Sequence, residues 1–405
     1  MNALLELVAR QLAEDLRRAP DAARTWFSDE ARAARCGSLA ELRTRARRTV
    51  ARPVFDYVDG AAWDEVTARR NREAFGRLAL APKALVDVSS IDMATTVLGR
   101  RIALPIIAPP TGLTGLVHPD GEAAIARAAH AAGTIYAQST LSSLSIEEVH
   151  AAAPGPKWFQ LYVQTDRGLV EELLARARAA GHEALMLTVD VAVAGVRERD
   201  VRNRFSVPPR LTARTLLDGL AHPRWSAAFA ARPRIMPGNF AFEGTARLAE
   251  HVNRQFDPAV TWDDLAWLRE RWSGPLAIKG IMRADDAARA VEHGVEAIIV
   301  SNHGGRQLDH AQATIEALPA IVEAVGGRAE VLLDSGVRRG TDIIKALALG
   351  ARAVLVGRPL VYGLGAAGEP GVRRAFELMR AELATALALA GYPRVAGLGP
   401  DAVVR

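Results

Sequence analysis

Residues 275–302 read PLAIKGIMRADDAARAVEHGVEAIIVSN, and the fold prediction rests on the pattern in this stretch. Two short apolar runs, at 275–280 and 296–302, flank a helical pattern at Asp285–His293. Strand-like runs that alternate with helical patterns of about 10–15 residues are typical of β-α-β units and of a parallel sheet.

The same alternation extends in both directions from this stretch. Together with the two runs above it gives eight apolar runs, IALPIIAP (102–109), TIYAQS (134–139), KWFQLYV (157–163), ALMLTVD (184–190), PLAIKG (275–280), EAIIVSN (296–302), EVLLDSG (330–336) and RAVLVGR (352–358). Helical patterns follow others of them, at Gly121–Ala132, Leu169–Ala180 and Asp342–Leu349. Eight such units are the number in a closed barrel, so the sequence predicts an α/β protein with the (β/α)₈ TIM-barrel fold.

Two regions depart from the repeating pattern. Residues 1–38 are rich in Ala and Arg and precede the barrel, so we expect an N-terminal helical extension followed by a barrel domain at 39–405. The gap from Val191 to Ser273 is too long for an ordinary connection between strands. It predicts an insertion after the fourth strand, at about 205–260.

Composition excludes several classes of protein. The net charge is +5, but no basic run is interleaved with aromatic residues as a nucleic-acid site requires. No apolar run is long enough to span a membrane, and the first 20 residues read as an amphipathic helix and lack the layout of a secretion signal. Cys36 is the only cysteine, so a disulfide within the chain is excluded; no metal-ligand spacing occurs, and we expect no metal and a cytoplasmic location.

Polar or glycine-rich residues follow each apolar run, where a barrel of this type carries its active site. Asp334-Ser335-Gly336-Val337-Arg338 follows the seventh run, and Gly357-Arg358 follows the eighth. Barrels often bind phosphate in the loops after these two strands, because glycine lets backbone N–H groups approach the anion and arginine matches its oxygens. The sequence therefore predicts a phosphate site there.

Two further features indicate redox or acid–base chemistry. Lys279 ends an apolar strand, where a charge that points into the barrel mouth needs a partner. The segment SNHGGRQLD (301–309) places His303 between a strand end and two glycines, with Arg306 three residues later. A 2-hydroxy acid needs such a pair, because the arginine can bind its carboxylate and the histidine can accept a proton.

The segment SNHGGRQLD resembles the active-site signature of the FMN-dependent 2-hydroxy-acid oxidases and dehydrogenases. The resemblance covers about residues 39–395. Within that family it is greatest to the bacterial (S)-mandelate dehydrogenases and then to the L-lactate dehydrogenases, through APPTGL (108–113), TVDVAVAGVRERDVRNRF (188–205) and LLDGLAHPRWSAAF (216–229). Ser335 stands where many members have glycine.

The resemblance implies a role for each matching residue. The substrate carboxylate would contact Tyr57 and Arg306, with Arg197 adding positive charge and Tyr162 a hydrogen bond. His303 would be the base and Asp190 would orient it. The cofactor would be FMN. Its ring would lie against Pro110, Thr111 and Gly112, and its other contacts would come from Ser139, Gln160, Thr188, Lys279, Ser301, Asp334, Gly336, Arg338, Gly357 and Arg358.

The implied reaction is oxidation of an (S)-2-hydroxy acid to the 2-oxo acid, by carbanion or hydride transfer, with electrons passed to a quinone or another carrier. The alternatives are an oxidase that uses O₂ and releases H₂O₂, and a biosynthetic tailoring oxidase. A flavin-binding protein without catalysis is disfavoured by the intact set of matching residues. Other phosphate-binding barrels lack the pair of His303 and Arg306. A homotetramer is the expected assembly.

Two finer expectations concern the substrate and the membrane. The resemblance places Gly112 where several oxidases of the family have alanine, and Leu141 and Ala194 where larger groups would lie near the substrate side chain. It therefore implies a preference for an aromatic or bulky acid such as mandelate over glycolate, and the same glycine implies a slow reaction with O₂. Residues 211–236 combine Trp225 and Phe229 with arginines and almost no acids, a composition typical of a membrane interface. We therefore expect peripheral contact with the inner face of the cell membrane, against the alternative that this segment packs on the barrel or on another subunit.

Overall fold

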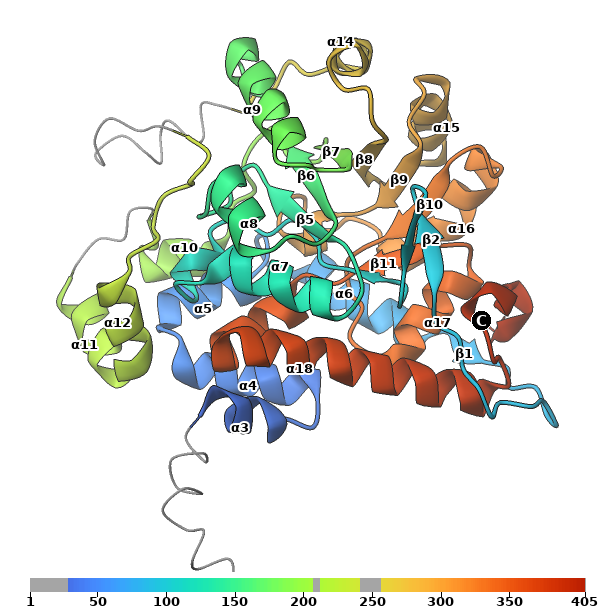
Figure 1. The fold of residues 1–405 in the computed structure, drawn as a ribbon, viewed down its shortest axis with the longest axis horizontal. Helices are drawn as coiled ribbons and strands as arrows, with labels where there is room; N and C mark the ends of the chain where they lie inside the picture. Colours follow the sequence, from blue (N-terminus) through green and yellow to red (C-terminus); the bar gives the residue numbers. More distant parts are fainter. Residues whose placement is uncertain (1–27, 207–211, 241–255, 405) are drawn as a thin grey trace, which may run out of the picture.

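The computed structural model describes residues 28–206, 212–240 and 256–404, and its centre is an eight-stranded parallel sheet (Figure 1). The strand order is β4-β11-β10-β9-β8-β7-β6-β5, and a bridge between Ala108 and Tyr136 joins the two ends. The predicted TIM barrel is therefore confirmed, and every predicted run contains one strand. The strands are β4 (Ile106–Ile107), β5 (Tyr136–Ser139), β6 (Lys157–Leu161), β7 (Ala184–Thr188), β8 (Leu276–Ile281), β9 (Ala297–Val300), β10 (Glu330–Leu333) and β11 (Ala353–Leu355).

The barrel interior is filled by side chains from all eight strands. Alternate strand residues form this inner cluster, whose largest members include Trp158, Met186 and Ile299. A hairpin of β2 (Thr95–Val97) and β3 (Arg100–Ile102) adds Val97 and Ile102 to the same cluster. The interior is thus a packed core without a pore, as is usual for this fold, and the residues after the strands are left for the site.

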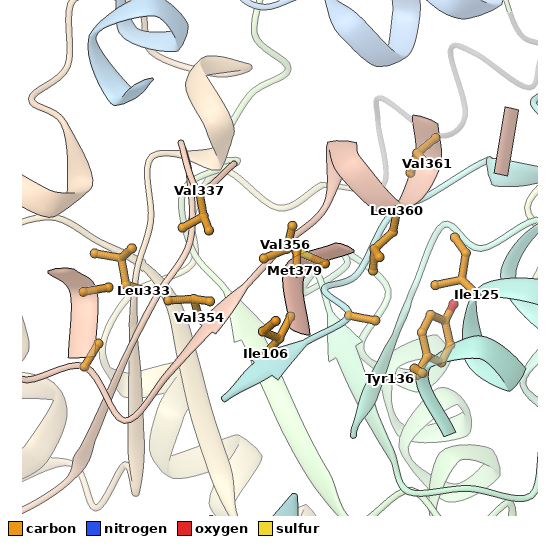
Figure 2. Close-up of a cluster of buried hydrophobic side chains, with 14 of the residues drawn as sticks. Ile106, Ile125, Tyr136, Leu333, Val337, Val354, Val356, Leu360, Val361 and Met379 are labelled. Carbon is orange, nitrogen blue, oxygen red and sulfur yellow. The ribbon is translucent and has the colours of Figure 1, made fainter. Parts of the chain in front are cut away.

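A second, larger core lies between the strands and the surrounding helices. Figure 2 shows part of it, where Ile106 and Val354 of the sheet lie near Leu360 and Met379 of the last helix. The outer helices are α7 (Gly121–Ala131), α8 (Ile146–Ala152), α9 (Arg167–Ala179), α14 (Asp263–Arg271), α15 (Ala284–Glu292), α16 (Thr314–Val325), α17 (Gly340–Ala348) and α18 (Arg358–Ala390).

The N-terminal helices are packed against the C-terminal one. The helices α3 (Asp29–Ala34) and α4 (Leu39–Thr49) lie beside α18 (Figure 1), and Cys36 between them is only 2% exposed. Residues 1–27 of the expected extension lie outside the described residues. The remaining elements are α5 (Arg52–Asp59), α6 (Val66–Gly76), short 3₁₀ turns at Thr114–Leu116, His303–Gly305, Val395–Gly397 and Pro400–Ala402, and an antiparallel pair β1 (Ala79–Leu80) and β12 (Val403–Val404).

Helix α10 (Glu198–Asn203) precedes the predicted insertion, whose described part contains α11 (Ala213–Ala221) and α12 (Pro223–Ala231). The rings of Trp225 and Phe229 stack 4.9 Å apart, and the Trp225 indole N–H donates to the Leu116 carbonyl over 2.9 Å. Both rings are therefore packed against the barrel. Among the large apolar side chains that the structure describes in this insertion, the exposed ones belong to α11 and are Leu216, Leu217 and Leu220.

The arginines of α12 and of the segment after it are occupied as well. Arg224 pairs with Asp29 over 2.8 Å, Arg232 with Asp120 over 3.1 Å, and Arg234 with Glu148 over 2.9 Å. Among the helices that the structure describes, none is long and apolar enough to cross a membrane.

Candidate functional site

A cavity of about 600 Å³ lies beyond the carboxyl ends of the strands. It is within the size range of small-molecule and cofactor sites, which is roughly 300–1,000 Å³. Most of the predicted site residues line it. The four that do not are Asp190, Gln160, Thr188 and Ser301, of which Gln160, Thr188 and Ser301 are buried.

A tight turn after β9 presents His303 to the cavity. His303 has φ +57°, and Gly304 and Gly305 have φ +66° and +75°, so three successive residues are left-handed. Glycine adopts this region freely, whereas histidine pays about 1–2 kcal/mol for it. The His303 backbone N–H donates to the Ser301 Oγ over 3.1 Å, and the ring Nδ1 lies 2.8 Å from the Asp190 Oδ1. These contacts fix the ring with its other nitrogen available.

The charges around His303 favour a neutral imidazole beside an ionised carboxylate. Burial lowers the pKa of His303 and Lys279 lowers it further, which together outweigh the opposite effect of Asp190. Burial opposes ionisation of Asp190, but its interaction with the His303 ring and the charge of Lys279 outweigh burial and hold the pKa of this carboxyl below its usual value. The arrangement is that of a general base oriented by a carboxylate.

Lys279 is buried beneath the cavity, with 4% of its surface exposed. Its Nζ donates to the Ser301 Oγ over 2.9 Å and lies 3.2 Å from the Asp334 Oδ2. Burial disfavours the ammonium, but Asp334 and Asp190 outweigh burial and raise the pKa of Lys279. A fixed positive charge therefore stands at the base of the cavity, and Ser301 connects it to the His303 turn.

Two arginines and two tyrosines surround the part of the cavity near His303. The guanidinium of Arg306 lies 5.0 Å from the centre of the Tyr57 ring, and that of Arg197 lies 5.5 Å from the same ring. Burial and the neighbouring Arg197 lower the pKa of Arg306 to about 10. Tyr162 lines the same region, and burial followed by the charge of Asp190 raises its pKa, which keeps its hydroxyl protonated. Two half-buried cations that repel one another favour binding of an anion such as a carboxylate.

A second pair of arginines lies where the cavity meets β10 and β11. Arg358 donates to the carbonyls of Val58, Gly304 and Gly60, and Arg338 donates to that of Val337. Burial and the neighbouring Arg358 lower the pKa of Arg338 to about 10. Within the described part of the chain neither guanidinium is paired with a carboxylate, so this region also favours an anion.

The turn between these arginines and the His303 loop is strained at one residue. Ser335 has φ +73°, which explains why glycine is frequent at this position in the resembling family. Its Oγ donates to the Asp334 Oδ1 over 2.6 Å and accepts from the Gly304 N–H over 2.9 Å, so the serine offsets its strain with two hydrogen bonds. At the next residue, Gly336, an added Cβ would collide with the Asn71 backbone carbonyl.

Several buried polar atoms at the other end of the site fit a ring with hydrogen-bonding edges. Among the described residues, the Thr111 Oγ1, the Gln160 Nε2 and the Thr188 Oγ1 are buried without a partner. Unpaired buried donors are costly, about 1–3 kcal/mol each, and commonly mark a ligand site. Unsatisfied donors at one end and an arginine pair at the other fit the ring and the phosphate of FMN.

Some residues of the site were not predicted from the sequence. Asp200 accepts a hydrogen bond from the Arg197 Nε over 2.7 Å. Arg197 and Asp200 stand three residues apart in the RERD motif (197–200), and this spacing could have indicated the pair. The Phe205 ring stacks on the Tyr57 ring, with 4.7 Å between the ring centres. The rings of Phe256 and Tyr162 meet edge to face, with 5.0 Å between their centres. Phe205 and Phe256 come from the long insertion, where no periodic pattern indicated their position.

Comparisons with known proteins agree with this geometry. Residues 46–405 match the family described as FMN-dependent dehydrogenase. The chain is 48% identical to an L-lactate oxidase of Nostoc sp. over 360 residues, which are 87% of this chain and 94% of the relative. It is 44% identical to glycolate oxidase 5 of Oryza sativa subsp. japonica over 367 residues, which are 91% and 95% of the two chains.

Comparison with solved structures also finds dehydrogenases and oxidases of 2-hydroxy acids. A crystal structure described as that of the monotopic membrane protein (S)-mandelate dehydrogenase superposes with a TM-score of 0.88 at 42% identity, covering 91% of this chain and 99% of that one. A mandelate oxidase structure superposes with a TM-score of 0.80 at 40% identity, with 91% and 98% covered. The protein therefore belongs to the FMN-dependent dehydrogenase family.

Proposed function

We propose that this protein oxidises an (S)-2-hydroxy acid to the 2-oxo acid, with His303 as the base that accepts the substrate proton. The observation that carries the proposal is the His303 ring, held 2.8 Å from Asp190 in the cavity that also exposes Arg197 and Arg306. A base beside two cations matches a substrate that has a carboxylate next to the carbon to be oxidised.

The residues near His303 then either bind the substrate carboxylate or act at the reacting oxygen. Arg306 and Tyr57 bind the substrate carboxylate, and Arg197 adds positive charge beside the reacting oxygen. Tyr162 donates a hydrogen bond to the substrate hydroxyl, for which it must stay protonated, and its raised pKa supports this role. Because burial lowers the pKa of His303, the imidazole is neutral at pH 7 and able to take the proton, and ionised Asp190 stabilises the imidazolium that results.

The rest of the predicted site would hold FMN, which when bound accepts two electrons from the substrate and delivers them to a second acceptor. The phosphate would be held by Gly336, Arg338, Gly357 and Arg358, and the ribityl chain by Asp334. The ring would be held by Pro110, Thr111, Gly112, Ser139, Gln160, Thr188 and Lys279. Ser301 would act through Lys279, to which it is hydrogen-bonded.

The substrate side chain is best accounted for by an aromatic or bulky group, as in mandelate. Gly112, Leu141 and Ala194 all line the cavity. The similarity to (S)-mandelate dehydrogenase and mandelate oxidase structures supports the same choice. L-Lactate is the second candidate, because the L-lactate oxidase of Nostoc sp. is 48% identical to this chain.

The acceptor that we propose is a quinone or another electron carrier, and the alternative is O₂ with release of H₂O₂. The expected slow reaction with O₂ depends on Gly112, which is closely packed, since an added Cβ would lie 3.0 Å from the Leu141 Cβ.

The experiment is to mix the FMN-loaded protein anaerobically with (S)-mandelate, L-lactate and glycolate and to follow the loss of flavin absorbance. We expect mandelate to have the highest efficiency. If none of the three bleaches the flavin, the proposed reaction is wrong; a higher efficiency for glycolate than for mandelate would refute the bulky side chain. Admitting air or a soluble quinone then compares the acceptors.

We also propose that α11 attaches the protein peripherally to the inner face of the cell membrane, which would place it near a quinone. On this helix Leu216, Leu217 and Leu220 are 55%, 67% and 77% exposed. Three exposed leucines on one short amphipathic helix are typical of a segment that inserts into a lipid interface. The homotetramer expected from the resemblance remains part of this proposal, with α11 on the outside of the assembly.

Co-sedimentation with anionic vesicles tests the attachment. The intact protein should sediment at low salt, a variant with all three leucines of α11 changed to Gln should stay in the supernatant, and Leu389→Gln, an exposed leucine of α18, should behave like the intact protein. If the intact protein stays in the supernatant, or if the α11 variant still sediments, α11 is not a membrane anchor.

A further inference from the structure

The loop between β7 and α10 carries Arg197 into the cavity, although it contains no regular structure of its own. Two hydrogen bonds hold its centre. The Gly195 N–H donates to the Gln307 Oε1 over 2.7 Å, and the Val196 carbonyl accepts from the Trp63 N–H over 3.0 Å. At the loop end that leads into α10, the Asn203 side chain of that helix donates to the Asp56 Oδ2 of α5 over 2.8 Å.

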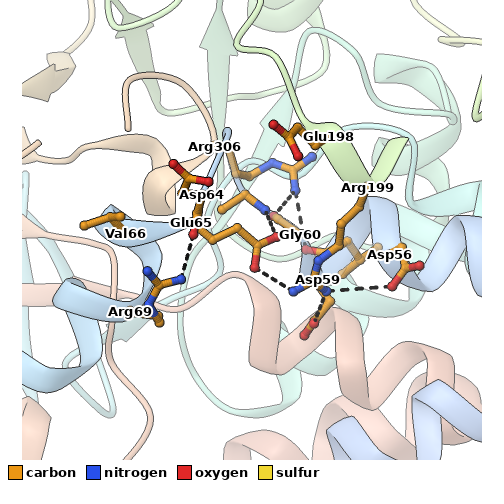
Figure 3. Close-up of polar contacts among 12 residues, drawn as sticks. Asp56, Asp59, Gly60, Asp64, Glu65, Val66, Arg69, Glu198, Arg199 and Arg306 are labelled. Carbon is orange, nitrogen blue, oxygen red and sulfur yellow. Dashed lines mark hydrogen bonds and ion pairs between the residues drawn. The ribbon is translucent and has the colours of Figure 1, made fainter. Parts of the chain in front are cut away.

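Arg199, two residues after Arg197, supplies a contact from α10 to the end of α5. Its Nη1 donates to the Asp59 Oδ2 over 2.9 Å, and its Nη2 donates to the Glu65 Oε2 over 2.6 Å (Figure 3). A third carboxylate, that of Asp56, lies 3.7 Å from the Nη1. Arg199 does not line the cavity, so it makes no contact with a ligand there.

The carboxylate that Arg199 contacts is itself firmly held. The Asp59 side chain is 6% exposed, and it accepts two hydrogen bonds from Arg43, over 2.6 and 2.8 Å, and one from the Tyr362 hydroxyl over 2.7 Å. Arg43 belongs to α4 and Tyr362 to α18, so Asp59 is fixed to the body of the protein. A network of this kind has few alternative arrangements, because breaking one partner leaves a buried charge.

The backbone of the same segment contacts the site. The carbonyls of Tyr57 and Gly60 accept from the Arg306 Nη1 over 2.7 and 3.2 Å, and Gly60 also accepts from Arg358 (Figure 3 shows Arg306 beside Gly60). The ring of Tyr57 in turn lies under Arg197. A shift of α10 against α5 would therefore move Arg197 relative to Tyr57 and Arg306.

We propose that Arg199 is a positioning residue, an ionic clamp between α10 and α5 that sets the separation of Arg197 from Tyr57 and Arg306 and thereby shapes the carboxylate-binding end of the site. This inference rests on the proposed function, since it concerns binding of the substrate carboxylate. Displacements of about 1 Å in such a site cost up to about 100-fold in rate.

The matched comparison is between Arg199→Gln and Arg202→Gln. Arg202 lies on the same helix, but its partner in the described part of the chain is Glu198, and both side chains are half or more exposed. Such surface pairs contribute little, about 0–1 kcal/mol. We expect Arg199→Gln to raise KM for the 2-hydroxy acid and the Kd for oxalate, a small carboxylate probe read by flavin absorbance, by roughly 10- to 100-fold. FMN affinity should change less than about twofold, and Arg202→Gln should match the wild type in every measurement.

Two further variants separate positioning from general destabilisation. Arg199→Lys keeps the charge and should recover part of the lost oxalate affinity. Glu65→Gln removes one partner and leaves Asp59 in place, so it should shift the oxalate Kd in the same direction by less, even if Arg199→Gln does not fold. An unchanged oxalate Kd in Arg199→Gln, or an equal loss of FMN affinity, would overturn the clamp. Because oxalate binding needs no turnover, the clamp can fail while the wild type oxidises hydroxy acids, and it can hold while the proposed reaction fails.

Discussion

Single residues in the His303 turn combine backbone strain with a fixed side chain. The left-handed conformation of His303 costs about 1–2 kcal/mol, which is close to what one or two hydrogen bonds to charged groups contribute. The contact with Asp190 involves a charged acceptor, and the contact with the neutral Ser301 hydroxyl typically adds about 0.5–1.5 kcal/mol, so together they offset the strain of the turn. The result is an imidazole with one nitrogen bound and one directed to the cavity, as a base requires.

Replacing this imidazole tests its role directly. Removal of a general base typically costs about 10²–10⁴-fold, so His303→Gln should slow anaerobic flavin reduction by at least that factor with FMN still bound. His293→Gln is the control, because that ring stacks on Trp262 and lies outside the cavity lining. Reduction by the His303 variant at a near-normal rate would exclude His303 as the base.

The pH dependence follows from the electrostatics of the same residue. The base must be neutral, and activity is lost as the pH falls through its pKa. Burial and Lys279 lower the pKa of His303 below the ordinary 6.5, so kcat/KM should be constant near pH 7 and its acid limb should lie below pH 6.5. Measuring kcat/KM with one substrate from pH 4.5 to 8 checks this. An acid limb centred above pH 7 would show that the environment of His303 is described wrongly.

At the scale of elements, one carboxyl connects helix α7 to the loops over the cavity. Glu122 is fully buried, and its Oε1 accepts from the backbone N–H groups of Thr114 and Ser143, over 3.1 and 2.8 Å. The Oε2 has no partner among the described residues. Burial therefore raises the pKa of Glu122, despite these hydrogen bonds.

The sign of the effect on stability can be worked out. A raised pKa in the folded state means that the contribution of Glu122 to stability is complete below the unfolded pKa of about 4.5 and is lost as the pH rises through the folded value. Glu122→Gln keeps the acceptor and is neutral at every pH. The thermal midpoint of this variant should equal that of the wild type near pH 4 and exceed it at pH 8. The corresponding gain in unfolding free energy at pH 8 is on the order of 1–3 kcal/mol. Glu148→Gln, on the surface, should show no such crossover. A constant difference across this range would contradict the prediction.

The elements themselves were largely predictable from the sequence, for a physical reason. A parallel strand buried on both faces reads as a continuous apolar run, so each of the eight predicted runs overlaps one strand of the sheet. The helices α7, α9, α15 and α17 lie within two residues of the predicted positions. The glycines and arginines after β10 and β11 were recognisable because the fold determines where those loops meet. Tyr57, Arg197 and the cofactor, by contrast, were indicated by resemblance and by no local pattern.

Other features could not be read from the sequence, because they depend on contacts between distant segments. The carboxylates that hold Arg199 come from α5 and the turn after it, about 140 positions earlier in the chain, and nothing in their spacing links them. Composition alone placed Trp225 beside the arginines of 211–236 as membrane-facing, whereas its indole N–H is bound by the Leu116 carbonyl. The apolar side chains of α11 are exposed and the rings of α12 are packed, and this difference depends on the folded structure, which the composition of the segment does not show.

At the scale of the whole molecule, the cavity joins strands that are far apart around the barrel. Thr111 follows β4, Lys279 lies on β8, and Arg338 and Arg358 follow β10 and β11, so one ligand that contacts all of them would connect opposite sides of the sheet. Among the described residues, the side chains of Thr111, Gln160 and Thr188 each keep a buried polar atom without a partner, and the charges of Arg338 and Arg358 repel one another. FMN should therefore stabilise the entire fold, beyond a local effect on one loop.

This gives a prediction for the intact protein. It should be purified yellow, with one FMN per chain and no FAD, and the thermal midpoint of the apoprotein should rise with added FMN. At 100 times the Kd the expected gain is about 2.7 kcal/mol. Arg338→Ala removes a charge-assisted contact worth about 1.5–3 kcal/mol, so it should weaken FMN binding by roughly 10- to 100-fold and shift the midpoint curve to higher FMN concentration. Arg339→Ala, which breaks an exposed pair with Glu382, should leave FMN affinity unchanged. If FAD stabilises the apoprotein as well as FMN does, or if both arginine variants bind FMN equally, the anion at this end of the cavity is not the FMN phosphate.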